Sequence, residues 1–348
     1  MLVRLREEIG ANGGWISFAR YMEIALYEPG LGYYAGAAPK FGAAGDFVTA
    51  PELGSLFGRT LARQLKLLPY PVLEFGAGTG ALAEALLSQQ HFDYRILETS
   101  AALKARQQER LGARARWLER LPERFRGTVI ANEVVDAMPV HAVAWREHGV
   151  MERGVSIAGD RLAWGERPAT GELLARAKEL PVSAPYESEI ALFARAWMRE
   201  LGERLQEGVV FVIDYGFPRR EYYHPQRSGG TLMSHHRHRA HSDVFARPGE
   251  ADITAHVEFT SLAEAAADAG LEVLGYTTQA QFLVNCGITD VLAEANLDNA
   301  LHYAPLASEA QKLLSPAEMG ELFKVLALGR GIREPLVGFF RGDRTATL

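Results

Sequence analysis

The chain has 348 residues, of which 48% are hydrophobic and 23% charged, with a formal net charge of −6 and a pI near 6.0. These values are typical of a soluble globular protein and give no overall attraction to nucleic acid. No apolar run approaches the roughly 20 residues of a membrane-spanning helix, and the charged N-terminus lacks a signal-peptide core. We therefore expect a cytoplasmic protein that binds neither membrane nor nucleic acid. The single cysteine, Cys286, has apolar neighbours and is predicted to be buried and redox-inactive.

Residues 1–69 precede the first clear strand pattern. They contain a stretch rich in glycine and tyrosine, 30–45, between two segments with helical spacing. Because glycine permits conformations that loops require, we interpret residues 1–69 as a helical segment that carries a lid.

The core begins near residue 70, where short apolar runs alternate with helical patterns. Such alternation predicts βαβ units and a parallel sheet. We expect strands at 71–75, 94–98, 115–118 and 128–132, and helices at 81–87 and 101–111.

Two insertions interrupt the alternation. Residues 137–185 show extended patterns and are predicted to form an inserted β-rich flap, and residues 217–253, rich in Arg, His, Gly and Pro, are predicted to form an active-site loop. The core is assigned to 70–136 and 186–348. Its second part contains predicted helices at 187–205, 261–269 and 289–314, and predicted strands at 208–214, 271–277 and 323–328. Together these elements predict a seven-stranded, mostly parallel α/β sheet.

A glycine-rich turn follows the first core strand, at Gly76, Ala77, Gly78 and Gly80. A strand that runs through such a turn into a helix presents backbone amides and the positive helix end to a ligand, as nucleotide-like cofactors require. The pattern alone leaves alternatives open. Gly76, Gly78 and Ala81 also fit a dinucleotide fingerprint, and the turn can serve only to connect strand and helix.

Two acidic residues favour S-adenosylmethionine as the cofactor. Glu74 lies at the strand end, where a carboxylate suits an ammonium group and repels a pyrophosphate. Glu98 ends the next strand, where a carboxylate can accept hydrogen bonds from both ribose hydroxyls of either cofactor. We therefore assign Glu74, the glycine turn and Glu98 to the cofactor site, together with Asn132 at the end of the fourth strand.

Several further motifs resemble the MidA-like methyltransferases, whose mitochondrial members are complex I assembly factors. The resemblance covers nearly the whole chain and rests on the segments Gly45 to Glu52, Glu74 to Gly80, Ala131 to Val140, Asp214 to Gly216, and Asp252 to Phe259. It implies a class I, Rossmann-like methyltransferase fold with an inserted lobe and, for the mitochondrial members, protein arginine methylation on a complex I subunit. One departure is Glu258, where aspartate is expected; it keeps the charge.

Glu133 and Asp136 are the first candidates for the catalytic carboxylates. They follow the fourth strand, at the carboxyl edge of the sheet where doubly wound folds bind ligands. A guanidinium nucleophile arrives charged, so carboxylates must orient it and accept its proton. The alternative is that Asp136 caps a helix and Glu133 is solvated.

Asp46, Glu52, Tyr215 and His256 are supporting catalytic candidates. Glu52 equally fits a first-turn helix acid, and Tyr215 can be a buried space-filler. The histidines between 235 and 241 invite a metal site, but arginines alternate with them and no acid or cysteine stands at a ligand spacing. No metal is expected.

Three functions remain open at this stage. A protein methyltransferase is favoured because two large insertions predict a wide cleft. A small-molecule or RNA methyltransferase and a cofactor-binding assembly chaperone without turnover are the alternatives. We expect a protein substrate, with a homodimer as an open possibility.

Overall fold

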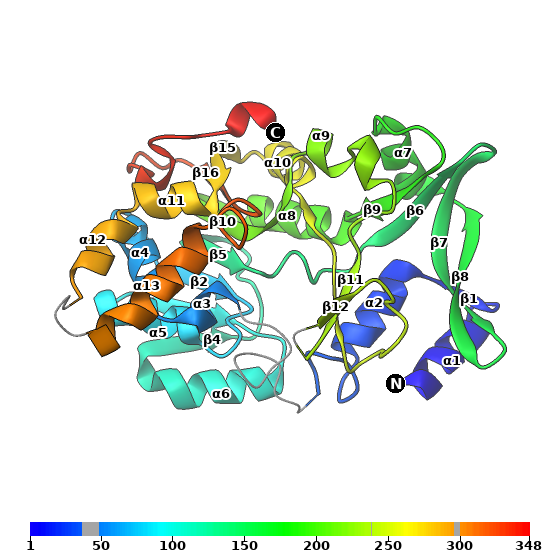
Figure 1. Ribbon diagram of the computed structural model, residues 1–348, viewed down its shortest axis with the longest axis horizontal. Coiled ribbons are helices and arrows are strands. Elements are labelled where there is room, and N and C mark those ends of the chain that lie inside the picture. Colours follow the sequence, from blue (N-terminus) through cyan, green and yellow to red (C-terminus); the bar gives the residue numbers. More distant parts are fainter. Residues whose placement is uncertain (37–48, 238, 296–299) are drawn as a thin grey trace.

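The computed structural model describes residues 1–36, 49–237, 239–295 and 300–348. A mostly parallel sheet forms the core of one half of the molecule, on the left in Figure 1. Seven described strands follow the order β15-β16-β10-β5-β2-β3-β4, in which only β16 runs antiparallel to its neighbours. The predicted seven-stranded sheet and α/β class are confirmed. The strands are β2 (Val72–Phe75), β3 (Tyr94–Leu97), β4 (Ala115–Leu118), β5 (Phe125–Asn132), β10 (Leu205–Phe217), β15 (Glu272–Thr278) and β16 (Phe323–Arg330); short β14 (Val257–Glu258) pairs with the end of β10.

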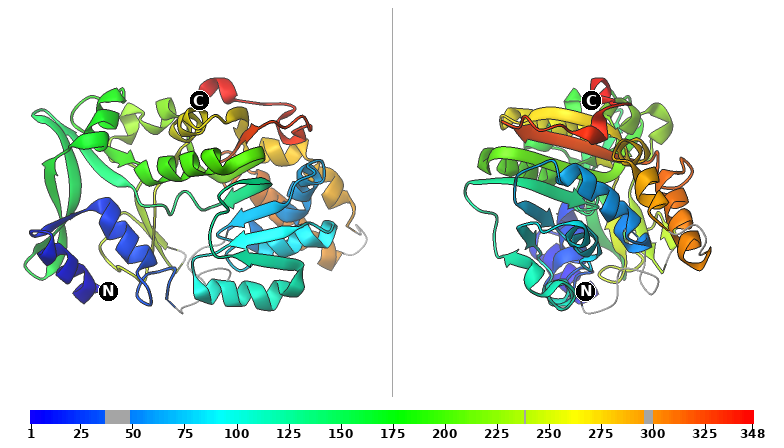
Figure 2. Two further views of the ribbon diagram at one scale, coloured as in Figure 1. Left: turned by 180° about the vertical axis from the view of Figure 1, so that it is seen from behind. Right: turned by 90° about the vertical axis from the view of Figure 1, so that its left-hand side faces the viewer.

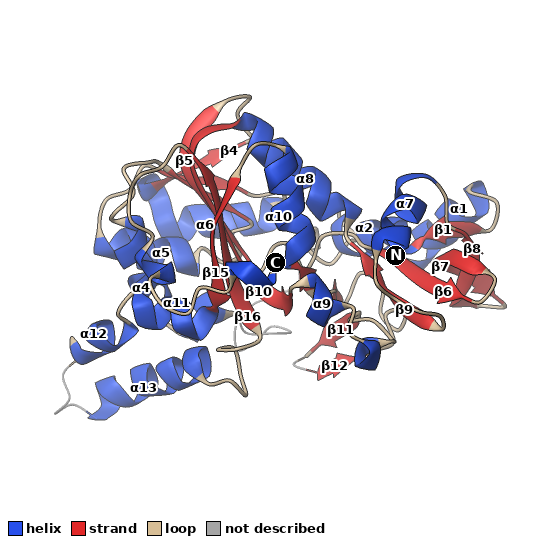
Figure 3. Ribbon diagram, turned by 90° about the horizontal axis from the view of Figure 1, so that it is seen from above, coloured by secondary structure: helices blue, strands red, loops and turns tan. Residues whose placement is uncertain are grey.

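Alternating side chains of these strands bury two separate cores. Val209 and Phe211 of β10 pack on one face of the sheet, and Val210 and Val212 pack on the other. This period of two in a run that is apolar throughout is typical of a sheet with helices on both faces. Figure 3 shows α4 (Leu56–Leu65), α5 (Ala81–Gln89) and α11 (Gln279–Asn285) on one face, and α8 (Leu192–Arg204) and α10 (Phe259–Asp268) on the other. The remaining core helices are α3 (Ala50–Leu53), α6 (Ala101–Leu111), α12 (Ile288–Ala293) and α13 (Ala300–Leu314).

A second, antiparallel sheet forms a lobe beside the core. It contains β1 (Trp15–Ser17), β6 (His141–Arg146), β7 (Gly149–Ala158), β8 (Arg161–Pro168) and β9 (Tyr186–Ile190). Helix α7 (Gly171–Glu179) connects β8 to β9 in the chain. Helices α1 (Leu2–Ala11) and α2 (Phe18–Tyr27) lie beside the β7–β8 hairpin, as Figure 2 shows from behind. The prediction of helix from residue 187 is therefore wrong for its first turn, because residues 186–190 pair with β6 along its length. Sheet pairing overrides the local helix propensity there.

The insertion 217–253 is more ordered than its composition predicts. It contains α9 (Arg219–Tyr222) and a small sheet of β11 (Met233–His236), β12 (Arg239–His241) and β13 (Asp252–Thr254) in the order β12-β11-β13. Short 3₁₀ turns occur at Gly112–Arg114, Pro225–Arg227, Val337–Phe339 and Thr345–Thr347.

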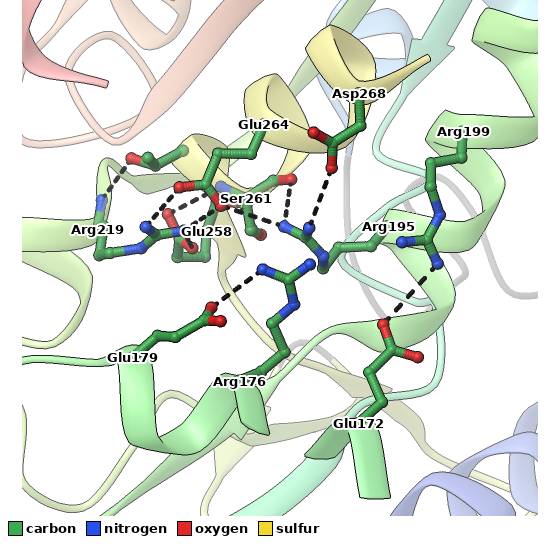
Figure 4. Close-up of polar contacts among 11 residues, drawn as sticks. Glu172, Arg176, Glu179, Arg195, Arg199, Arg219, Glu258, Ser261, Glu264 and Asp268 are labelled. Carbon is green, nitrogen blue, oxygen red and sulfur yellow. Dashed lines mark hydrogen bonds and ion pairs between the residues drawn. The ribbon is translucent and has the colours of Figure 1, made fainter. Parts of the chain in front are cut away.

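A charged cluster fastens this insertion to the outer face of the core (Figure 4). Arg195 of α8 is 2% exposed and donates to the carbonyl of Ser261 at 2.9 Å and to Glu264 at 3.3 Å. Arg219, at the start of the insertion, donates to both oxygens of Glu264 at 2.6 and 2.7 Å and lies 3.4 Å from Glu258. Because charge-assisted, bidentate contacts are directional, they fix where the insertion leaves the sheet.

No helix in the described part of the chain combines the length and apolar character needed to cross a membrane. Cys286 is buried as predicted, and burial raises the pKa of its thiol to about 12.

Candidate functional site

A cavity of about 330 Å³ opens at the carboxyl ends of β2, β3 and β5. It is the position at which open parallel sheets bind ligands. Its lining combines three sets of residues: the turn after β2, the ends of β3 and β5, and segments of the N-terminal region. They include Tyr27, Tyr34, Thr49, Glu52, Glu74, Gly76, Ala77, Gly78, Thr79, Glu98, Asn132, Glu133 and Asp136.

The glycine turn is shaped for close approach of a ligand. Gly76, Gly78 and Gly80 have φ values of +58°, +54° and +82°, a backbone conformation that side chains disfavour. A Cβ on Gly76 would also lie 3.3 Å from the side chain of Val134. Gly80 is the N-cap of α5, whose first residues Ala81 and Leu82 also line the cavity. The turn and its neighbouring acids fit a nucleoside cofactor with an ammonium group.

Glu74 is held at the end of β2 with only 2% of its surface exposed. The Tyr94 hydroxyl donates to it at 2.8 Å. Burial raises the pKa of Glu74 to about 8, against the lowering effect of the Tyr94 hydrogen bond. A cation beside this carboxyl group would favour its charged form.

Glu98 is oriented by Gln107, a residue that the sequence did not indicate as part of the site. Gln107 of α6 is fully buried, and its amide nitrogen donates to Glu98 and to the carbonyl of Gly78, at 2.9 Å each. The Trp117 indole donates to the Gln107 oxygen at 2.9 Å, which fixes the direction of the amide. The backbone of Ser100 donates to the other Glu98 oxygen at 2.9 Å. Gln107 therefore links the glycine turn to the proposed ribose acid.

Glu133 has an unusual backbone conformation next to Asn132. Its φ is +52°, which is strained for a residue with a side chain. The amide of Ala50 and the side chain of Asn132 donate to the Glu133 carboxylate at 3.2 and 3.3 Å. Burial, then the charge of Asp136, raise the pKa of Glu133 to about 8. Strain at such a position is typical of functional sites.

Asp136 lies beside Glu133 at the cavity, with Tyr215 behind it. Burial raises the pKa of Asp136 to about 6, and the Tyr215 hydroxyl opposes this rise. Oδ1 of Asp136 is buried and has no hydrogen-bond partner among the described residues. Asp214, fully buried, accepts from the backbone amides of Val135, Asp136 and Tyr215 at 2.9 to 3.2 Å. It fixes the turn that carries the acidic pair.

The supporting candidates have different positions. Glu52 lines the cavity and accepts a hydrogen bond from Thr79. Tyr215 and His256 are not among the lining residues; their rings lie 5.2 Å apart, and the backbone of His256 donates to Thr231 at 3.0 Å. Burial lowers the pKa of His256 to about 4, so its ring is neutral near pH 7. Asp46 lies outside the described residues.

Across the described ranges, no group of three or more His, Cys, Asp or Glu side chains is placed to hold a metal ion. His235 instead contacts the Thr254 hydroxyl at 3.2 Å, and His236 contacts the Glu250 carbonyl at 3.3 Å.

Comparison with known proteins identifies the family. The family model described as "Putative S-adenosyl-L-methionine-dependent methyltransferase" matches residues 56–277. A crystal structure from Burkholderia thailandensis with bound S-adenosyl-homocysteine is 51% identical, with a TM-score of 0.95 over 100% of this chain and 96% of that one. The mitochondrial protein arginine methyltransferase NDUFAF7 homolog of Drosophila melanogaster is 27% identical over 97% of this chain and 87% of its own length, and the Danio rerio protein is 28% identical over 94% and 86%. The resemblance inferred from the motifs is confirmed, and the chain belongs to this family of S-adenosyl-L-methionine-dependent methyltransferases.

Proposed function

We propose that the protein transfers a methyl group from S-adenosylmethionine to a guanidinium nitrogen of an arginine side chain in a protein. The observation that carries the proposal is the acidic pair Glu133 and Asp136, which lies in the same cavity as the glycine turn. Within the described residues, the cavity lining contains both acids and no Lys, Arg or His. A buried acidic pair that has no cation beside it in the described part of the cavity is suited to receive one from a substrate.

The raised pKa values suit the chemistry of this step. The cofactor supplies an electrophilic methyl carbon on a sulfonium; the nitrogen–carbon bond forms as the sulfur–carbon bond breaks, and sulfur becomes a neutral thioether. The methylated guanidinium must then lose one proton to keep its single positive charge. Burial raises the pKa of Glu133 to about 8 and that of Asp136 to about 6. A bound guanidinium favours the charged form of both groups, and in that form they can accept the proton.

Two further features support a planar cation as the acceptor. Tyr27 and Tyr34 line the cavity with rings stacked 5.5 Å apart, and aromatic faces attract guanidinium groups. Their hydroxyls donate to the carbonyl of Ala137 at 2.9 Å and to Asp252 at 3.0 Å, which holds the rings in place. The names of the mitochondrial relatives also support arginine. A respiratory complex I subunit, which the family resemblance implies as substrate, is part of the same proposal.

The test uses tritiated methyl groups. Purified protein is incubated with S-[methyl-³H]adenosylmethionine and a lysate of cells that lack the gene, and the labelled products are hydrolysed and separated. We expect the label in methylarginine. Label in RNA or in small molecules would favour those substrates, and no label with intact cofactor binding would favour an assembly chaperone.

Two conservative variants locate the reaction. Glu133→Gln and Asp136→Asn should each lower turnover by about 100-fold or more, the range typical of general-base removal, while affinity for S-adenosyl-homocysteine changes little. Glu318→Gln is the matched control, because Glu318 is exposed and does not line the cavity. Full activity of Glu133→Gln and Asp136→Asn would contradict the proposal.

A further inference from the structure

Helix α3 lies between the two halves of the site. On one side, the Glu52 carboxylate accepts a hydrogen bond from the Thr79 hydroxyl in the glycine turn. On the other side, the amide of Ala50 donates to the Glu133 carboxylate at 3.2 Å. Thr49, Pro51 and Glu52 also line the cavity. One short helix therefore contacts both the cofactor turn and a proposed catalytic acid.

The Thr79 end of this link is firmly held. Arg110 of α6 donates to the Thr79 hydroxyl at 2.7 Å and to its carbonyl at 3.2 Å. Arg110 also pairs with Glu84 at 3.4 Å. Because the Thr79 hydroxyl accepts from Arg110, its own hydrogen is directed to Glu52. This hydrogen bond thus couples the position of the Glu52 carboxylate to the position of the glycine turn.

The Glu133 end depends on the same helix. Its strained backbone is fixed by a hydrogen bond from its amide to the carbonyl of Ile213 at 2.9 Å. The side chain is directed by Ala50 and Asn132 alone among the described residues. Behind α3, Glu309 accepts from the amides of Leu56 and Phe57 at 2.8 and 3.2 Å, which anchors the following helix. The position of Ala50 therefore decides where the Glu133 carboxylate points.

We propose that Thr79 and Glu52 are positioning residues, which couple occupation of the cofactor turn to the orientation of Glu133 through α3. Glu52 then acts as a hydrogen-bond acceptor and takes no proton from substrate. A cofactor that orders the turn also orders α3 and aligns the catalytic acid before substrate arrives. By linkage, substrate held by Glu133 strengthens cofactor binding by the same factor. The kinetic part of this inference rests on the proposed function, and the structural part does not.

Hydrogen exchange followed by mass spectrometry tests the structural part without any substrate. In the wild type, saturating S-adenosyl-homocysteine should slow exchange of amides in residues 50–53 about tenfold or more. Thr79→Ser keeps the hydroxyl and should behave like the wild type. Thr79→Val keeps the shape and removes the hydroxyl, so protection should fall below about twofold at saturation. Equal protection in Thr79→Val and wild type would overturn the coupling.

Kinetics with two Glu52 variants separate positioning from proton transfer. Glu52→Gln retains an acceptor for Thr79 and should keep turnover within about threefold of wild type. Glu52→Ala removes the acceptor and should lower turnover about tenfold, and bound substrate should no longer strengthen cofactor binding. Loss of activity in Glu52→Gln as severe as in Glu133→Gln would mean that Glu52 is itself a proton acceptor. If the wild type methylates no arginine, the proposed function fails, and the exchange experiment still decides the coupling.

Discussion

Replacing Gln107 by leucine tests how the cofactor site is held together. The amide of Gln107 makes one hydrogen bond to the Glu98 carboxylate and one to the Gly78 carbonyl, and it accepts one from Trp117. Leucine fills most of the same buried space and removes all three contacts. We expect Glu98 to lose its fixed orientation and, because we propose that it binds the ribose hydroxyls, we expect a loss of cofactor affinity.

The expected magnitude follows from the charged contact. A hydrogen bond to a charged group contributes about 1.5–3 kcal/mol, and each 1.4 kcal/mol corresponds to about tenfold in affinity. The dissociation constant of S-adenosyl-homocysteine in Gln107→Leu should thus rise about 10- to 100-fold in calorimetric titration. Gln108→Leu, on the exposed face of the same helix, should leave it within about twofold.

A ligand without one ribose hydroxyl makes the test specific. The wild type should bind 2′-deoxy-S-adenosyl-homocysteine distinctly more weakly than the parent compound, because one ribose hydroxyl that we propose donates to Glu98 is then missing. In Gln107→Leu this discrimination should largely disappear. The reasoning is refuted if Gln107→Leu binds the parent compound as the wild type does, or if it discriminates between the two ligands equally well.

Three further predictions concern the surrounding residues. The pKa of Glu74 is raised from 4.5 to about 8, so between these pH values the folded, ligand-free protein holds a proton that the unfolded chain has lost. Its thermal stability should therefore fall as pH rises from about 4.5 to about 8. Glu74→Gln should flatten part of this fall in melting curves. Gly76→Val places a branched side chain at a φ of +58° and against the side chain of Val134. It should abolish S-adenosyl-homocysteine binding in calorimetry. Binding equal to that of the wild type would show that the turn lies away from the cofactor. Asp214→Ala leaves three backbone amides without their acceptor and should destabilise the fold by about 3 kcal/mol in urea unfolding; a loss below about 1 kcal/mol would contradict that role.

The core could be predicted because its signals are local and repeated. Apolar runs such as 208–214, bounded by turn residues, have few stable arrangements other than central strands. The glycine turn and the acids at strand ends are similarly local, since the fold brings the ends of parallel strands to one edge. Apart from Gly80, the predicted turn residues and the acids Glu74, Glu98, Glu133 and Asp136 line one cavity in the structure.

The parts that could not be predicted depend on distant partners. Strand β1 has only three residues and exists because Trp15 to Ser17 pair with β7, about 140 residues away. Gln107 reads as one polar residue on a helix, and its contacts to Gly78 and Glu98 appear only when α6 packs beside the turn. The link through Glu52 likewise requires α3 to reach across from the N-terminal region. A single sequence carries no local signal for such contacts.

The most direct test of arginine methylation compares the methylarginine content of proteins in four strains by tandem mass spectrometry: wild type, a deletion of the gene, and the deletion complemented with wild type or with Glu133→Gln. We expect at least one protein arginine that is methylated in the wild type and restored by the wild-type gene, but unmodified in the deletion and in the Glu133→Gln strain. Identical methylarginine profiles in all four strains would contradict the proposed function.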